Sequence, residues 1–141
     1  MKQTGMILTC VITVALGGFG IRSLHAQEKQ EYVPKAETVK LVETSLHGEP
    51  GKKVQIRYSK LPPGYVGEKH YHSGPVFVYV LNGSFAIDEA GKSRQIFQAG
   101  QVYQEPVGKT MQARNLSTSE PTEILIFQVY GEGEALMYKV E

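Results

Sequence analysis

The chain has 141 residues, with 15 Lys and Arg against 14 Asp and Glu and a formal net charge of +1 at pH 7. A balance this close to neutral argues against nucleic acid or an anionic membrane surface as the partner. The sequence also has no Gly-rich phosphate loop and no serine in a nucleophile elbow, which excludes two common classes of enzyme site.

Residues 1–26 have the pattern of a secretory signal peptide. Lys2 gives a positive start, residues 6–21 are apolar and uncharged, and Ala26 closes a short segment suited to cleavage. An uncleaved N-terminal anchor is the alternative, but the apolar run is somewhat short for a spanning helix and contains three glycines. We therefore expect an exported protein, periplasmic or secreted, that contacts the membrane only through this segment if it stays uncleaved.

Cleavage after Ala26 would leave 115 residues with 13 basic and 14 acidic side chains. It would also remove Cys10, the only cysteine, so the mature chain would have no disulfide and no thiol chemistry. This length suits one domain that buries its own core. Residues 27–37 are mostly polar and predict a flexible arm, and residues 38–141 form the domain.

The domain sequence predicts short β-strands divided by turns, with no stretch of convincing helical period. Residues 53–58 alternate and place Val54, Ile56 and Tyr58 on one face of a strand. The continuous apolar run 76–81 predicts a strand that is covered on both sides. Further strands are expected at 39–42, 84–88, 95–97, 101–104, 111–115, 123–130 and 135–140. Short strands with frequent turns indicate an all-β sandwich or barrel.

Two histidines are the first candidate ligands. His70 and His72 are two residues apart, so in a strand both imidazoles leave the same face. Two imidazoles that point into one space can begin a metal site. Histidines at a strand start are also common as ordinary polar surface, so the surrounding sequence has to decide between these interpretations.

The surrounding residues fit two spaced motifs. The first is G-x5-H-x-H-x3-E-x6-G, and the second is G-x5-P-x-G-x2-H-x3-N. Eight of the ten positions match, namely Gly64, His70, His72, Gly83, Gly100, Pro106, Gly108 and Asn115. The chain therefore resembles the cupin family, and the resemblance implies a single-domain jelly-roll β-barrel over residues 38–141.

The two mismatches fall on positions that hold metal in the family. Val76 stands where the motif has Glu, and Met111 stands where it has the third His. The resemblance thus implies a degenerate site that holds one divalent metal or Cu(I) only weakly. A thioether is a poor ligand for Fe(II), Mn(II) and Zn(II) but an acceptable one for Cu(I). Met111 can instead fill the space of the missing imidazole as a packing residue, and we favour this interpretation.

Two acids could complete the site. Glu68 shares the parity of His70 and His72, and Glu105 lies directly before Pro106. A carboxylate with two histidines would form the facial arrangement known from oxygen-using iron sites. Both acids are also typical of solvated loops, and the sequence leaves the choice open.

The barrel interior is predicted from the same alternation. Val76, Val78, Tyr103 and Ala113 are expected to line a pocket. Arg57 and Arg114 would hold an anionic ligand if they faced inward, although arginine on a barrel strand usually faces solvent.

The outward face of the strand at 76–81 carries Phe77, Tyr79 and Leu81 and needs a cover. In cupins the cover is often a second subunit, so we expect a homodimer. The alternative is that the N-terminal strand of the chain covers this face.

Three functions remain open. The first is a binding module that holds a small organic ligand in its barrel, with little or no metal. The second is a metal-dependent oxygenase, lyase or isomerase with altered ligands. The third is a copper-binding protein that uses His70, His72 and Met111. Cupins host many chemistries, so the fold does not decide whether the protein is an enzyme, and the missing ligands favour the binding module.

Overall fold

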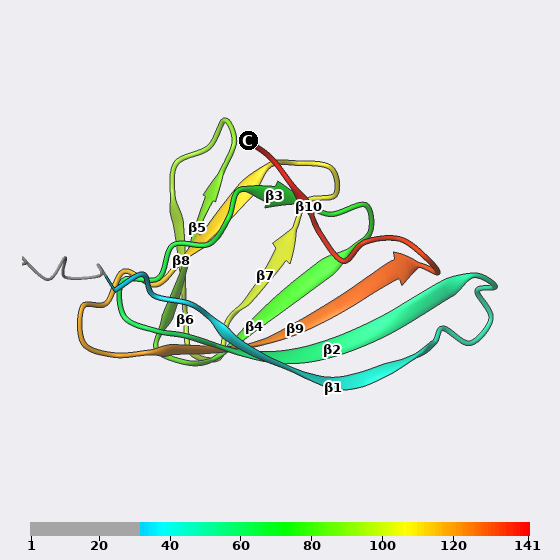
Figure 1. The fold of residues 1–141 in the computed structure, drawn as a ribbon, viewed down its shortest axis with the longest axis horizontal. Helices are drawn as coiled ribbons and strands as arrows, with labels where there is room; N and C mark the ends of the chain where they lie inside the picture. The colour runs from blue at the N-terminus through cyan, green and yellow to red at the C-terminus, as the bar shows by residue number, and fades with distance from the viewer. Residues whose placement is uncertain (1–31) are drawn as a thin grey trace, which may run out of the picture. The chain divides into compact units, whose positions relative to one another are not determined.

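The computed structural model describes residues 32–141, and the predicted signal peptide lies outside them. Within these described residues, ten strands follow one another (Figure 1). They are β1 (Glu37–Ser45), β2 (Lys52–Leu61), β3 (His70–Tyr71), β4 (Val76–Asn82), β5 (Ser84–Glu89), β6 (Gln95–Gln98), β7 (Val102–Glu105), β8 (Met111–Arg114), β9 (Thr122–Gly131) and β10 (Tyr138–Lys139). Within residues 32–141, no helix is long and apolar enough to cross a membrane.

The strands form two antiparallel five-stranded sheets. One has the order β1-β2-β9-β4-β7 and the other the order β10-β3-β8-β5-β6. From β2 onward the chain crosses between the sheets at almost every connection, so that strands distant in sequence become neighbours (Figure 1). This is the jelly-roll arrangement, and it confirms the predicted all-β barrel.

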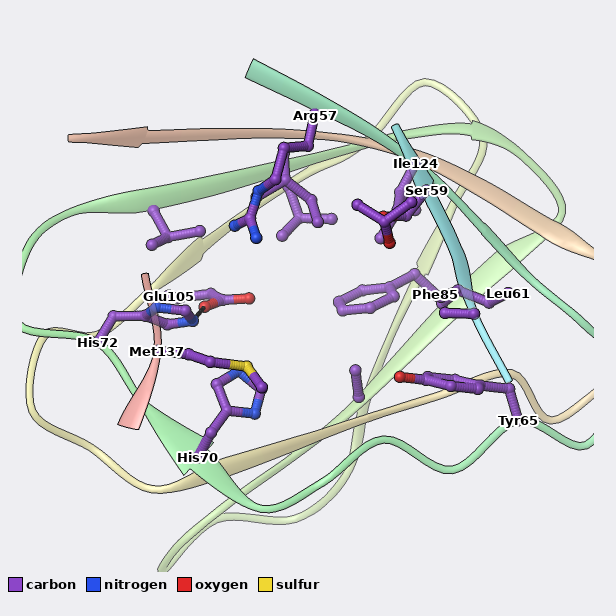
Figure 2. Close-up of a pocket in the computed structure, with 16 residues that line it drawn as sticks. Arg57, Ser59, Leu61, Tyr65, His70, His72, Phe85, Glu105, Ile124 and Met137 are labelled. Carbon is purple, nitrogen blue, oxygen red and sulfur yellow. Dashed lines mark hydrogen bonds and ion pairs between the residues drawn. The ribbon is translucent and has the colours of Figure 1, made fainter. Parts of the chain in front are cut away.

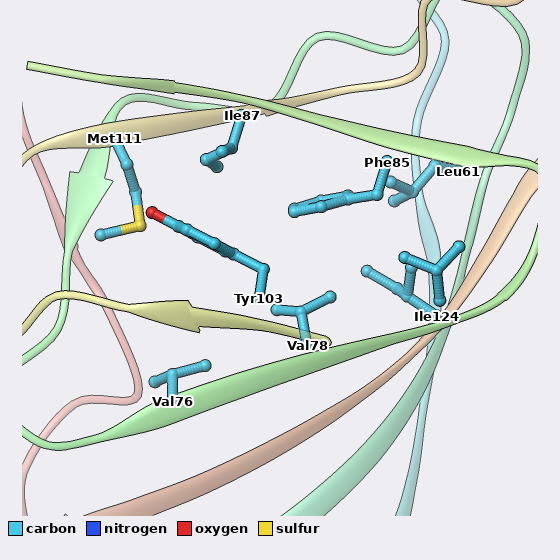
Figure 3. Packing of buried hydrophobic residues seen from close by; sticks show 9 residues of the cluster. Leu61, Val76, Val78, Phe85, Ile87, Tyr103, Met111 and Ile124 are labelled. Carbon is cyan, nitrogen blue, oxygen red and sulfur yellow. The ribbon is translucent and has the colours of Figure 1, made fainter. Parts of the chain in front are cut away.

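The core lies between the sheets, and β4 shows how the sequence builds it. Val76, Val78 and Val80 are at most 1% exposed, whereas Tyr79 and Leu81 are each 41% exposed. The inward and outward residues alternate as predicted, because successive side chains of a strand leave opposite faces. The buried cluster comprises Leu61, Val76, Val78, Val80, Phe85, Ile87, Tyr103, Met111 and Ile124 (Figure 3).

The apolar side of β2 is its outer side. Ile56 pairs with Phe127, which pairs in turn with Phe77, so these side chains share the outer face of the sheet. Arg57 and Ser59 have the opposite parity to Ile56 on β2. They therefore point into the barrel, where both line a cavity.

β1 lies at the edge of its sheet and pairs with β2. It therefore extends the sheet and does not cover the outer face of β4, which argues against the N-terminal strand as a cover. β1 begins at Glu37, and Ala36 packs against the core. The last residues of the segment predicted as a flexible arm are thus part of the barrel.

Several motif residues hold the backbone around the site. Gly108 adopts a φ of 71°, where a side chain would be strained, and its N–H donates to the carbonyl of His72 at 2.9 Å. Asn115 is 2% exposed, and its amide donates to the carbonyls of Leu61, Pro62 and Glu120. These positions match the motif because the loops need them, independently of any metal.

Candidate metal centre and cavity

A cavity of about 310 Å³ lies inside the barrel. Figure 2 shows a polar end with His72, Glu105 and His70, and an opposite end with Phe85, Leu61 and Tyr65. Val76, Val78 and Ala113, three of the four predicted pocket residues, line it. The fourth, Tyr103, lies in the buried cluster, where its hydroxyl donates to Glu89 Oε2 at 3.3 Å.

His70, His72 and Glu105 come together at the polar end. Each offers one ligand atom, and these atoms lie within 4.8 Å of one another. The two imidazole centroids are 4.9 Å apart with an interplanar angle of 82°. His70 is half-buried, whereas His72 and Glu105 are 5% and 6% exposed. The structure thus brings both predicted histidines together with one of the two predicted acids.

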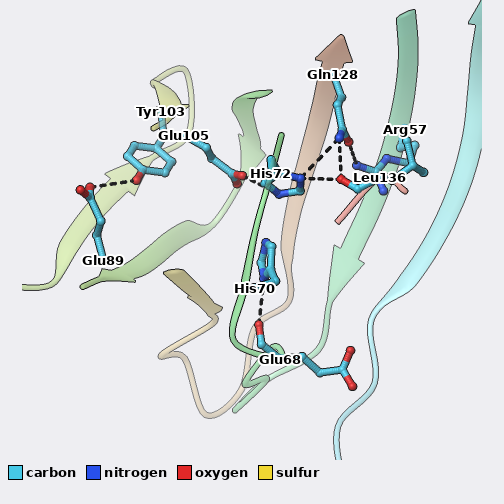
Figure 4. Close-up of polar contacts among 9 residues, drawn as sticks. All are labelled: Arg57, Glu68, His70, His72, Glu89, Tyr103, Glu105, Gln128 and Leu136. Atoms are coloured by element: carbon cyan, nitrogen blue, oxygen red, sulfur yellow. Dashed lines mark hydrogen bonds and ion pairs between the residues drawn. The ribbon is translucent and has the colours of Figure 1, made fainter. Parts of the chain in front are cut away.

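Backbone carbonyls set the tautomer of both histidines (Figure 4). His70 Nδ1 lies 2.8 Å from the carbonyl oxygen of Glu68, and His72 Nδ1 lies 2.5 Å from that of Leu136. A carbonyl only accepts hydrogen bonds, so each Nδ1 carries the hydrogen. In the neutral ring Nε2 then keeps its lone pair, as a metal-ligating histidine requires.

The contact between His72 and Glu105 fits a shared ion. His72 Nε2 is 2.9 Å from Glu105 Oε2, yet no hydrogen bond of acceptable geometry joins them. Among residues 32–141, this buried oxygen has no hydrogen-bond partner. Two ligands about 2.1 Å from one ion and at right angles to each other stand about 3.0 Å apart. Such ligands point at the ion and not at each other, so the spacing of the His72–Glu105 pair fits a shared divalent metal.

A second row of polar groups supports His72. Gln128 is fully buried and donates from Nε2 to the carbonyl of Leu136 at 2.5 Å. Arg57 Nη2 in turn donates to Gln128 Oε1 at 2.8 Å. This network fixes the carbonyl that orients the imidazole (Figure 4), as outer contacts do around metal ligands.

Burial alters the ionisation of two cavity side chains. It lowers the pKa of the Arg57 guanidinium, and the nearby negative charge of Glu105 opposes that shift. Burial also raises the pKa of the Tyr65 hydroxyl, with a smaller contribution from Glu68. Tyr65 is therefore a neutral hydroxyl at physiological pH.

Other predicted site residues lie elsewhere. The Glu68 carboxylate pairs with Lys139 Nζ at 2.7 Å on the surface, and only its backbone carbonyl contacts His70. Met111 is 1% exposed within the hydrophobic cluster. Arg114 donates to Asp88 at 2.6 Å and does not line the cavity.

A family model described as a cupin domain matches residues 57–128. The matched segment contains both motifs and all three candidate ligands. The chain belongs to the cupin domain family. Among curated proteins, no sequence matches this cupin.

Solved structures resemble this cupin in fold. A DMSP lyase, DddQ from Ruegeria pomeroyi, is 17% identical, with a TM-score of 0.58 over 74% of this chain and 51% of the lyase. An RmlC-like cupin family protein from Methanocaldococcus jannaschii is 22% identical, with a TM-score of 0.56 over 70% of this chain and 90% of the other. An oxalate decarboxylase from Bacillus subtilis is 17% identical, with a TM-score of 0.56 over 78% of this chain and 29% of that enzyme. This cupin therefore spans about half the length of the lyase and less than a third of the decarboxylase.

Sequence reasoning missed three contributors to the site. Gln128 is a polar residue inside the apolar strand β9, and that interruption was the available signal. Met137 lines the cavity, and Leu136 acts through its backbone carbonyl. The sequence predicts a strand at 135–140, but the structure has only Tyr138–Lys139 as β10, and Leu136 and Met137 lie in the segment just before it.

Proposed function

We propose that this cupin is a metal-dependent enzyme that acts on a small organic molecule inside its barrel. His70, His72 and Glu105 would hold one divalent ion. The observation that carries the proposal is the buried Glu105 Oε2, which lies 2.9 Å from His72 Nε2 without a hydrogen-bond partner among residues 32–141. The expectation of weak metal binding rested on two missing ligands, and Glu105 supplies a third donor.

A divalent ion bound by three protein ligands keeps open positions and acts there as a Lewis acid toward a substrate oxygen. The surrounding residues keep the site ready for this role. The carbonyls of Glu68 and Leu136 hold the imidazoles in the tautomer that offers Nε2. The apolar walls formed by Val78, Phe85 and Ile126 reduce the access of water to the substrate.

The comparisons support an enzyme only at the level of the fold. Two of the proteins with similar structures are a DMSP lyase and an oxalate decarboxylase. The binding module without metal is the second candidate. In that case the contact of His72 Nε2 with Glu105 Oε2 would be a structural one at the polar end of the cavity, with no ion between them.

Calorimetric titration with Zn(II) tests the metal site, using protein without a His tag. We expect stoichiometric Zn(II) binding by the native protein. Glu105→Gln should lower the Zn(II) affinity by more than roughly a hundredfold, which is the loss when a residue that only supports a metal ligand is changed. Glu68→Gln is the matched control, because its carboxylate pairs with Lys139 on the surface. Equal Zn(II) affinity of Glu105→Gln and native protein would exclude Glu105 as a ligand, and no Zn(II) binding by the native protein would leave the metal-free binding module.

The same proposal includes export and a homodimer. Export is supported by the charged start, the apolar run and Ala26 in the sequence. Intact mass of the protein recovered from the native cell envelope tests it. A mature chain that begins near Gln27 is the expected result, and recovery of the protein from the cytosol would contradict export.

A further inference from the structure

We propose that Arg57 binds the carboxylate of the substrate, and that the substrate is a small organic acid with an apolar body. This inference rests on the proposed function of the same cavity and names its substrate class. It starts from a charged side chain that the metal site leaves unused.

The guanidinium of Arg57 enters the cavity from β2, on the same side as Glu105 and His72 (Figure 2). Its Nη2 donates to Gln128 Oε1 at 2.8 Å. Its Nε is buried and has no hydrogen-bond partner among residues 32–141. Within the same residues, no carboxylate lies within ion-pair distance of this guanidinium.

A half-buried cation without an anion is costly to the folded protein. Desolvation penalises the charge, and an unmade hydrogen bond at a buried donor adds to the penalty. Arginine cannot relieve the cost by losing its proton in a protein. An anion that enters the cavity would remove both penalties, so the resting site is preorganised for one.

Glu105 is the nearest rival partner, since its negative charge acts on Arg57. It lies against His72, however, and forms no ion pair with the guanidinium. In the proposed metal site its charge is directed toward the ion. Arg57 then remains available for a second anion, which would lie between the guanidinium and the metal ligands.

The rest of the cavity indicates what carries the anion. Phe85, Leu61 and Ile124 line the end away from the histidines (Figure 2). These walls suit a hydrocarbon body and not a fully hydrated phosphate. A planar carboxylate matches the fork of a guanidinium. The volume of about 310 Å³ holds about ten water-sized groups at ~30 Å³ each. The ligand is therefore a small acid.

The remaining polar groups of the cavity are compatible with an anion. The hydroxyls of Thr38 and Ser59 lie 2.7 Å apart and both line the wall near Arg57. Burial raises the pKa of Tyr65, so its hydroxyl is neutral. These groups donate hydrogen bonds and add no negative charge.

Fluorine NMR titration with para-fluorobenzoate and trifluoroacetate tests the inference, with para-fluorobenzamide as the neutral analogue. We expect Arg57→Met to weaken binding of the acid about tenfold or more, as loss of a charged hydrogen bond does. Binding of the amide should not change. Lys60→Met is the matched control, because it removes a positive charge from an exposed position on the same strand.

Two further readouts keep the outcome clear. If Arg57→Met fails to fold, Arg57→Lys retains the charge but loses the fork, and it should bind the acid less tightly than native protein. Zn(II) titration of the same variants reports the metal site separately. Acid binding that depends on Arg57 in a protein that binds no Zn(II) would support this inference and refute the metal-dependent function. Equal binding of the acid by native protein and Arg57→Met, or no binding of either acid at millimolar concentration, would overturn it.

Discussion

Val76 and Glu105 lie directly opposite each other in the antiparallel pair of β4 and β7. Val76 occupies the position at which the cupin motif carries its carboxylate ligand. Opposite residues of such a pair have Cβ atoms about 4.5–5.5 Å apart on the same face of the sheet. The carboxylate of Glu105 therefore enters the space that a glutamate at position 76 would occupy.

This relationship predicts that the carboxylate can be moved back. Glu105→Val alone should weaken Zn(II) binding by more than the roughly hundredfold that is lost when a residue that only supports a metal ligand is changed. The double variant Val76→Glu with Glu105→Val should recover most of that loss, because the donor returns to the same space from the other strand. Isothermal titration calorimetry measures the Zn(II) affinity of the native protein, the single variant and the double variant. A double variant that binds no better than Glu105→Val would show that the site requires the geometry of β7.

Met111 should be unimportant for metal binding. Its side chain is 1% exposed and packs beside Ile87 and Tyr103 in the buried cluster (Figure 3). We expect Met111→Leu to leave Cu(I) and Zn(II) affinities unchanged and to cost less than about 1.5 kcal/mol of stability, because the change conserves volume. Competition titration with a Cu(I) chelator measures the affinity. Met137→Leu is the matched control, because that thioether lines the cavity. A loss of Cu(I) binding confined to Met111→Leu would support the copper function.

Asp88 predicts a pH-dependent part of the stability. Arg94 and Arg114 each donate to its carboxylate at 2.6 Å, and they lower its pKa to about 2. In the unfolded chain the pKa is about 3.9. The folded state thus gains stability from Asp88 above about pH 4 and loses it as the pH falls through about 2.

The variant Asp88→Asn should therefore lower the Tm at pH 7 and match the native protein near pH 2. The effect at neutral pH should be roughly 1 kcal/mol or less, since solvent screens partly exposed ion pairs. Thermal unfolding followed by circular dichroism from pH 2 to pH 7 measures the difference. A difference that is the same at both ends of this range would mean that the charge is not its cause.

The outer face of the larger sheet predicts a homodimer. Tyr79 and Leu81 are 41% exposed and Phe127 is 38% exposed, and together they continue the apolar side of β2. Because β1 lies at the edge, a second copy of the chain is the cover that we expect. Light scattering of the mature protein should give twice the monomer mass. Tyr79→Glu should lower the measured mass to that of the monomer, while Lys60→Met, at an exposed position, should not. A native protein that stays monomeric at all concentrations would contradict this.

Local spacing in the sequence determined the fold and the two histidines of the candidate site. Gly108 matches the motif because a positive φ is a local need that few residues other than glycine meet. His70 and His72 share a face through strand alternation. Such features depend on residues near one another in the chain, so they can be recognised before the structure is known.

Only the tertiary structure decided what joins the histidines. Glu105 is 33 positions beyond His72, and Arg57 is 15 positions before it. Their convergence depends on strand order and register, which alternation within one strand does not specify. Alternation on β2 placed Val54, Ile56 and Tyr58 on one face but did not say which face is inside. The apolar side turned outward because neighbouring strands continue it there, and Arg57 was thereby directed into the cavity.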